Sequence, residues 1–318
     1  MMQVALIGIS AGAATALLFA SVASGSALSV PLFYLAPLPI LIAAMGWSHW
    51  AALIAALAAA VGLAAIFGWL FFVAFMIGIG LPAWWLGYLT LLARPAVGAT
   101  PDGLEWYPVG HLVFWAAMIG AAIVIIAMLS LGSDLDTFRN SLRSGLERML
   151  KMPARAPSGP DVEPSRLIDV LIAVLPPAAA VLTTITSLVN LWLAGRIVMV
   201  SGRLRRPPPD LAAMQFPVYA SGLLGAAVAA SFLSGIVGIL AGVLAASLLM
   251  AYAVLGFAVL HMITRGINGR PFTLGGIYVA VFIFGWPVLA MSLLGLADTA
   301  FDLRGRIARR RGSSNPQT

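Results

Sequence analysis

The sequence predicts an all-α fold, a polytopic transmembrane helical bundle of about eight or nine membrane segments with one interfacial amphipathic helix. The first observation behind this prediction is composition, because 61% of the 318 residues are hydrophobic and only 9% are charged. A soluble domain carries about 25% charged residues, since its surface must face water. The second observation is that no charged side chain precedes Arg94. Together they exclude a soluble enzyme, a disordered regulator and a fibrous repeat.

The third observation is a series of apolar runs, each close to the roughly 20 residues that a helix needs to cross the hydrocarbon core. Each run should be helical, because backbone polar groups in lipid must be satisfied within their own segment. The runs cover residues 4–24, 30–46, 50–67, 69–93, 109–131, 168–193, 213–233, 236–262 and 273–297. The second and third runs are short, so they either tilt or dip in without crossing. The first run lacks a basic region ahead of it, which favours a retained span over a cleaved signal peptide.

Turn-forming residues separate the runs. Pro31, Pro37 and Pro39 make the second run irregular, because each proline removes a backbone donor and clashes with the preceding turn. Gly68 separates the third run from the fourth, and the stretch 94–108, rich in glycine and proline, is expected to be a loop. Small residues at four-residue spacing are expected to let helices approach closely, namely Gly8, Gly12 and Ala16, and Gly238 and Gly242.

The chain is expected to consist of four segments. These are N-terminal membrane helices in 1–131, an amphipathic helix and Pro-rich linker in 132–166, C-terminal membrane helices in 167–303, and a basic polar tail in 304–318. The second segment is the only extended polar region between apolar runs, which is why it divides the membrane helices into two groups.

Residues 134–152 show the spacing of an amphipathic helix, with apolar side chains three and four positions apart. The apolar face is formed by Leu135, Phe138, Leu142, Leu146 and Met149, and another face carries Arg139, Arg143, Glu147 and Lys151. Ser133 and Asp136 are spaced as an N-terminal capping box. Two interpretations stay open, a helix in the membrane interface or a solvated helix that covers its own protein. Residues 153–165 are rich in proline and are expected to form a flexible linker.

The positions of the basic clusters predict how the chain is oriented, because basic loops prefer the cytoplasm. The clusters 196–206 and Arg265/Arg270 are placed inside, together with the amino terminus, and the nearly neutral region 132–166 is placed outside. The last run then either delivers the tail to the outside or turns back near Gly285-Trp286-Pro287. A turn there would be re-entrant, because each half of the run is too short to cross.

The sequence gives no visible support for catalysis, and it predicts neither a metal site nor a cofactor. It contains no cysteine, Walker loop, GxSxG motif or paired catalytic carboxylates. Asp298 and Asp302 lie four residues apart with Arg304 and Arg306 close by, and they are expected to form a local ion-pair network at a helix end. The histidines are each isolated at the end of an apolar run, where an imidazole reaches headgroups or water: His49, His111 and His261.

The sixth run supplies the main candidate for a binding site. Thr183, Ser187 and Asn190 share one helical face at membrane depth, where polar side chains face protein or a water-filled cavity. One interpretation is hydrogen bonding between helices, worth about 0.6 kcal/mol per contact. The functional interpretation is a solute pocket. Trp84 and Trp85 would then form a stacking wall for a planar solute, against the alternative of an aromatic belt at the headgroups.

The charge balance predicts lipid contacts. Eighteen bases against 11 acids give a net charge of +7. The bases lie between and after apolar runs, so they are expected to attract anionic lipid headgroups and not nucleic acid. The side chains expected at the headgroups are Arg139, Arg143, Lys151, Arg304, Arg306 and Arg309.

Four segments occur in the order in which they occur in a known family. They are Pro37-Leu38-Pro39, Gly80-Leu81-Pro82 with Gly87-Tyr88-Leu89, the helix from Leu175-Pro176 through Asn190 to Ala194-Gly195-Arg196, and Leu294-Gly295-Leu296-Ala297-Asp298 with Phe301-Asp302-Leu303-Arg304. On these segments the chain resembles the YybS-like family of predicted bacterial membrane proteins of unknown function. The resemblance implies an inner-membrane bundle distantly similar to the substrate-capturing S components of energy-coupling-factor vitamin transporters. It implies no ligand and no functional residues.

Two functional hypotheses of different classes follow. The first is a solute-binding or transport-related module of the bacterial inner membrane, which would need an energising protein partner because the sequence has no nucleotide-binding motif. The second is a structural or assembly protein of the cell envelope, acting through protein and lipid contacts of the interfacial helix and the basic tail. Membrane lipids are expected partners in both, and an enzyme is not expected.

Overall fold

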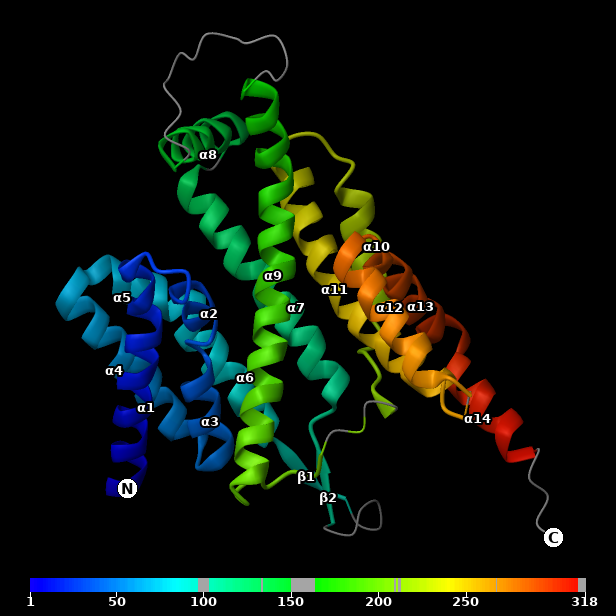
Figure 1. Ribbon diagram of the computed structural model, residues 1–318. Helices are drawn as coiled ribbons and strands as arrows, with labels where there is room; N and C mark the ends of the chain where they lie inside the picture. Colours follow the sequence, from blue (N-terminus) through cyan, green and yellow to red (C-terminus); the bar gives the residue numbers. More distant parts are fainter. Residues whose placement is uncertain are drawn as a thin grey trace. The chain divides into compact units, whose positions relative to one another are not determined.

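The computed structural model describes residues 1–96, 103–132, 134–149, 164–208, 210, 213–266 and 268–313. Contacts group the chain into two compact units (Figure 1). Unit 1 comprises Met1–Ala116 and Ile185–Asp210, and unit 2 comprises Ala117–Thr184 and Leu211–Thr318. Two long helices, α7 and α9, contribute one part to each unit.

The described residues of unit 1 form mainly helices, together with one short hairpin. Its helices are α1 (Met2–Ala20), a 3₁₀ turn (Ser21–Ser24), α2 (Ser29–Tyr34), α3 (Leu38–Gly46), α4 (His49–Phe67), α5 (Trp69–Phe75), a π-helical turn (Met76–Gly80) and α6 (Leu81–Leu91). The strands β1 (Ala93–Pro95) and β2 (Leu104–Trp106) follow. The first residues of α7 (Val109–Leu131) and the last residues of α9 (Pro164–Val200) complete the unit.

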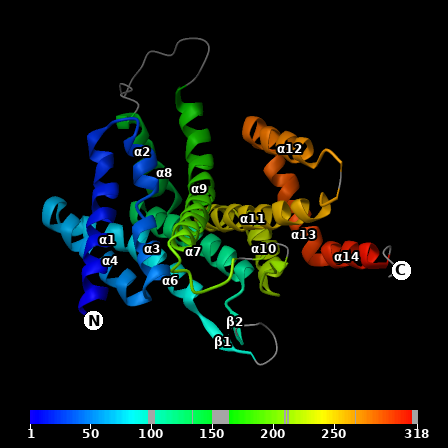
Figure 2. The same cartoon turned by 60° about the horizontal axis from the view of Figure 1, so that its bottom comes forward.

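Unit 2 contains the remaining parts of α7 and α9 and a further set of helices. These are α8 (Leu135–Met149), α10 (Ala220–Ala230), α11 (Ile236–Ile263), α12 (Arg270–Phe284), α13 (Pro287–Phe301) and α14 (Leu303–Ser313). The first part of the predicted polar tail is therefore helical. Figure 2 shows α14 continuing from α13 toward the carboxyl terminus.

The structure confirms the all-α class, with fewer spans than predicted. Within the described ranges, seven segments are long and apolar enough to cross a membrane, against the expected eight or nine. They are Met2–Ser24, Ser29–Gly46, His49–Phe67, Trp69–Leu91, Val109–Leu131, Val170–Val200 and Ile236–Ile263. In the expected run 213–233, the α-helix α10 has only 11 residues, which is too short to cross. The expected run 273–297 divides into α12 and α13, because Gly285 breaks the helix with a φ of 69°.

The break at Gly285 lies at the turn that the sequence predicted. Each half, α12 and α13, has 15 residues and is about 22 Å long at 1.5 Å per residue. Neither reaches across a hydrocarbon core of about 30 Å. This length favours the re-entrant alternative, and the sidedness of the tail stays a prediction.

The predicted irregularity of the second run is confirmed. Turns at 35–37 separate α2 from α3, and Leu38 N donates to Leu35 O at 3.0 Å in place of the regular bond to Tyr34 O. Pro37 has no N–H to continue the helix. Gly68, with a φ of 93°, likewise ends α4 and begins α5. The π-helical turn that follows lies directly ahead of Pro82, another residue without a backbone donor.

Glycines on α1 allow it to pack directly on α4, as the spacing predicted. A Cβ on Gly12 would lie 2.6 Å from Ala55 O, and one on Gly8 would lie 2.9 Å from Ala51 O. The facing side of α4 is made of buried alanines, Ala51, Ala52, Ala55, Ala56, Ala59 and Ala60. Two small-residue surfaces thus bring the backbones together, and dispersion over this contact replaces the hydrophobic driving force that lipid does not supply.

Glycines also allow close packing in unit 2, where α13 crosses α11. Their positions are not among the small-residue spacings predicted for helix packing. A Cβ on Gly256 of α11 would collide with Met291 O, and one on Gly295 of α13 would collide with Tyr252 O. The expected small pair on α11 acts differently, because Gly238 lies against Leu233 O in the preceding turn. The hydroxyl of Ser292 donates across the crossing to Leu249 O at 2.7 Å.

The amphipathic helix α8 packs on its own unit. Phe138 is 1% exposed and joins a core cluster with Ala121, Val124, Met128, Ile172, Ala180 and Val243. The structure therefore supports the interpretation that α8 covers its own protein. The expected cap on Ser133 lies outside the described residues, and the acceptor is Asp134, whose Oδ1 accepts from Thr137 N at 2.9 Å. Hydrogen bonding to Thr137 lowers the pKa of Asp134.

Replacing Gly12 with alanine should destabilise the protein, because the methyl group would meet the α4 backbone at Ala55 O. Overpacking of this kind costs about 1–3 kcal/mol. Gly62→Ala on α4 is the matched control, since a Cβ there has no neighbour within 4 Å and gains about 1 kcal/mol of helix propensity. Thermal denaturation in detergent, followed by circular dichroism, should show opposite shifts of Tm. Equal shifts of the same sign would refute the close packing.

Candidate functional site

Polar side chains of α9 make contacts between helices. Thr184, not Thr183, is buried, and its Oγ1 lies 2.7 Å from Ser247 Oγ on α11. Ser247 Oγ in turn donates to Ala117 O on α7 at 2.7 Å. Gly120 makes room for this contact, because a Cβ there would lie 2.6 Å from Thr184 Oγ1. Thr183 donates to Ala179 O of its own helix.

Asn190, in the part of α9 that belongs to unit 1, forms a hydrogen bond with the last backbone carbonyl of α2. It is 1% exposed, and its Nδ2 donates to Tyr34 O at 2.8 Å. That carbonyl has lost its regular helical donor at the turn before Leu38. The same Nδ2 also donates to Thr186 O at 2.8 Å, whereas Oδ1 is buried without a protein partner. Ser187 lies half-buried one turn earlier.

Trp84 and Trp85 belong to an aromatic cluster in unit 1, made of Trp84, Trp85, Tyr88, Tyr107 and Trp115. Trp84 stacks on Tyr88 at 6.1 Å between ring centroids, and Trp85 meets Trp115 edge to face at 5.6 Å. Trp115 Nε1 donates to the Tyr107 hydroxyl at 3.1 Å. The cluster thus links α6 and the start of α7 to the residues after β2.

The loop predicted over 94–108 contains the β1–β2 hairpin. The strands pair antiparallel with Arg94 opposite Glu105, and Arg94 Nη2 lies 2.7 Å from Glu105 Oε2. The side chains are 77% and 47% exposed, so the pair contributes at most about 1 kcal/mol. Its effect is to hold a guanidinium and a carboxylate at the edge of a cavity.

A cavity of about 340 Å³ lies beside this hairpin, and we refer to it as the hairpin cavity. Its lining includes Arg94, Glu105, Trp106, Tyr107, Pro108 and His111. Tyr107 joins the cavity to the aromatic cluster, and its ring meets the imidazole of His111 at 5.7 Å. Arg206 reaches the same place from the segment after α9, where its Nη2 donates to Tyr107 O at 3.3 Å. Burial lowers the pKa of Arg206.

Several buried side-chain nitrogens of unit 1 lack a protein partner. Among the described residues of unit 1, they include Trp84 Nε1, Trp85 Nε1, His111 Nδ1 and Arg206 Nε. Buried polar atoms are normally paired with protein or with ordered water, so each exception needs an explanation. His111 is the informative one, because it also lines the cavity. Among the described residues, no group of three potential metal ligands occurs.

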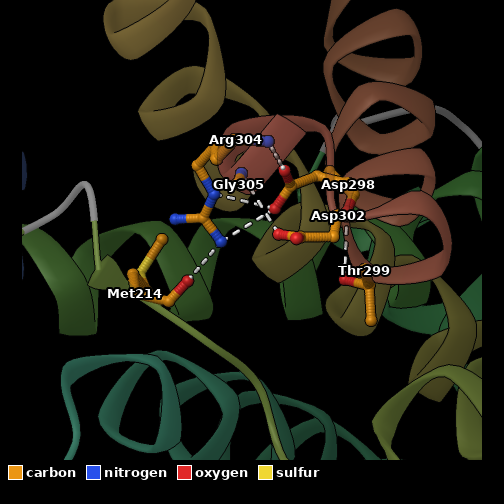
Figure 3. A network of polar contacts seen from close by, with 7 residues as sticks. Met214, Asp298, Thr299, Asp302, Arg304 and Gly305 are labelled. Atoms are coloured by element: carbon orange, nitrogen blue, oxygen red, sulfur yellow. Dashed lines mark hydrogen bonds and ion pairs between the residues drawn. The ribbon is translucent and has the colours of Figure 1, made fainter. Parts of the chain in front are cut away.

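A second polar site lies in unit 2 where α13 meets α14 (Figure 3). Arg304 is 9% exposed and Asp298 is 5% exposed. Arg304 Nε and Nη2 each lie 2.8 Å from Asp298 Oδ2, and Nη2 also donates to Met214 O at 2.7 Å. The ion pairing predicted at this helix end is confirmed for Asp298 and Arg304, and it encloses the first arginine of the tail, whereas Asp302 pairs with Arg309 and not with Arg306 as predicted.

The expected headgroup residues divide into four groups. Arg304 does not fit that role, because Asp298 and Met214 O hold it inside unit 2. Arg306 and Arg309 of α14 are exposed, and Arg309 Nη2 lies 3.1 Å from Asp302 Oδ2. Arg139 and Arg143 lie on α8, whereas Lys151 lies outside the described residues.

Removal of Asp298 should be costly. Asp298→Ala leaves Arg304 buried without its counter-charge, and breaking a buried pair in this way costs about 3–5 kcal/mol. The matched control is Asp302→Ala, which removes an exposed pair with Arg309 worth at most about 1 kcal/mol. Tm in detergent should fall strongly for the first variant and little for the second. The double variant Asp298→Leu/Arg304→Met should recover part of the loss, and equal losses for both single variants would contradict the burial.

Residues 13–299 match the model of a family described as predicted membrane protein (DUF2232). No curated protein and no solved structure matches the chain. The match spans both units and includes each of the seven helical segments that are long and apolar enough to cross a membrane, the first of them in part. The chain therefore belongs to the DUF2232 family of multi-pass membrane proteins.

Proposed function

We propose that this chain is a solute-binding, transport-related module of the bacterial inner membrane, and that it is not itself an enzyme. The observation that carries the proposal is the hairpin cavity, whose wall includes a buried imidazole nitrogen of His111 without a protein partner. Its volume of about 340 Å³ lies at the lower end of the range of about 300–1,000 Å³ for ligand sites. The resemblance to the YybS-like family and to S components supports the same class.

The lining of the cavity favours a small planar solute with polar edges. Trp106, Tyr107 and His111 offer ring faces, on which a planar molecule can stack. The guanidinium of Arg94 offers a fork of donors to a carboxylate or carbonyl group, and Glu105 offers acceptors. Because Arg94 and Glu105 pair with each other across an exposed hairpin, exchange of this weak pair for a solute costs little.

The predicted pocket on α9 is replaced in this proposal by the hairpin cavity. Thr184 beside Thr183 serves helix contacts, and the amide nitrogen of Asn190 serves the backbone of α2. Trp84 and Trp85 remain in the proposal, because they belong to the aromatic cluster, which also includes Tyr107 of the cavity wall. Transport against a gradient would require an energising protein partner, because the sequence contains no nucleotide-binding motif.

The proposal is tested by native mass spectrometry of the full chain purified in detergent. A small non-lipid molecule should remain bound to the wild-type protein and should be released on unfolding. In Arg94→Gln and His111→Gln the Kd for the solute should rise about tenfold, which corresponds to 1.4 kcal/mol, and the occupied fraction should fall accordingly. Arg203→Gln is the control, because Arg203 lies over the ring of Trp47 at 4.7 Å and does not line the hairpin cavity.

Two outcomes would count against the solute-binding role. Wild-type protein that carries no non-lipid molecule would remove its basis, as would equal retention by all three variants. If a protein without ATPase character co-purified in place of a solute, the alternative of a structural or assembly protein of the cell envelope would be favoured. That alternative has less support from the tail than the sequence suggested, because Arg304 is buried.

A further inference from the structure

A hollow in unit 2 lies beside α8. It has a volume of about 790 Å³ and is bounded by α8, the first half of α9, and the turn between α10 and α11 with the start of α11. We refer to it as the α8 groove. All of its lining residues belong to unit 2, so it is separate from the hairpin cavity of unit 1.

The two sides of the α8 groove differ in chemistry. The side formed by α8 is polar and carries Arg139, Asn140, Arg143 and Asp136. The lining contributed by α9 and α11 is apolar and includes Ile172 and Ile239. Arg139 is exposed, and α8 itself is fixed by the buried ring of Phe138. A fixed helix therefore presents cationic side chains at one edge of an apolar trough.

Glycine keeps the floor of the trough open. Gly242 of α11 lines the α8 groove, and a Cβ there would meet only the Cβ of Ser231, at 3.9 Å. Gly235, also in the lining, has no neighbour within 4 Å of such a Cβ. An apolar chain could lie along this part of the floor without displacing a side chain.

The α9 wall adds hydrogen-bond acceptors. Pro176 and Pro177 lie inside α9 and have no N–H. The carbonyls of Ile172 and Ala173, four residues earlier, therefore lack their regular helical donors, and both residues line the α8 groove. Carbonyls in this position can accept from hydroxyl groups of a molecule that lies in the trough.

From these features we infer that the α8 groove binds one molecule of an anionic phospholipid whose headgroup carries hydroxyl groups. The phosphate would lie at the guanidinium of Arg139, with Arg143 adding positive charge at the same edge. The headgroup hydroxyls would donate to Asp136 and to the carbonyls of Ile172 and Ala173. One acyl chain would lie over Gly242 and Ile239. The amphipathic occupant matches the order of charged and apolar surface, which neither a free anion nor a purely apolar helix does.

The inference is tested with delipidated full-length protein in detergent, titrated with phosphatidylglycerol or with phosphatidylcholine of the same acyl chains. Native mass spectrometry should show one phosphatidylglycerol retained at concentrations where phosphatidylcholine is not. Arg139→Gln should weaken that binding about tenfold. Arg205→Gln, which removes an exposed arginine of unit 1, should leave it unchanged.

A steric variant tests the apolar half of the site. Gly242→Leu should fill the trough and abolish retention of the lipid. Gly222→Leu adds the same bulk at an exposed position of α10 with no neighbour within 4 Å, and it should retain the lipid. If Gly242→Leu does not fold, Arg139→Gln remains decisive, because Arg139 is an exposed side chain.

Three results would overturn the inference. The first is equal retention of the two phospholipids by the wild-type protein. The second is unchanged binding in Arg139→Gln, which would place the retained lipid elsewhere. The third is complete displacement of phosphatidylglycerol by millimolar inorganic phosphate, which would indicate a site for a free anion and not for a lipid. Each of these results is independent of whether the hairpin cavity of unit 1 holds a solute.

Discussion

Polar groups within an apolar bundle must find their partners inside the protein, and this requirement governs the structure at every level. A broken helix leaves Tyr34 O without its donor, and Asn190 supplies one from another helix. Ser247 and Ser292 donate to carbonyls of neighbouring helices, Ala117 O and Leu249 O. These buried polar side chains therefore join helices. In water the same bonds would be worth less to the fold, because the freed groups could hydrate.

Close approach of backbones is the second condition, and it follows from the first. Side chains such as Ser247 and Thr184 are short, so they reach a neighbouring helix only when the axes are close. Glycine supplies that proximity at Gly12 in unit 1 and at Gly256 and Gly295 in unit 2. Packing and hydrogen bonding thus reinforce each other, as expected where lipid is as apolar as the side chains it replaces.

Both proposed sites lie where this internal satisfaction is incomplete. In unit 1 His111, which lines the hairpin cavity, has its Nδ1 buried without a protein partner. In unit 2 two prolines deprive the carbonyls of Ile172 and Ala173 of their helical donors beside an open trough. In contrast, the Asp298–Arg304 pair is fully used for joining α13, α14 and the segment at Met214. Its burial explains why an arginine that looks like part of a basic tail is a structural residue.

The sequence by itself determined the membrane class, the breaks at Pro37, Gly68 and Gly285, and the ion pairing around Asp298, because these follow from local composition and backbone chemistry. Only the tertiary structure decided which faces of the helices meet. A helix such as α11 is apolar all round, so its sequence does not distinguish a lipid-facing side from a protein-facing one. Contacts between helices decide that Thr184 and not Thr183 of α9 is buried, and that Gly256 and not Gly238 of α11 forms the crossing with α13. The two cavities likewise lie at residues that the sequence did not bring together.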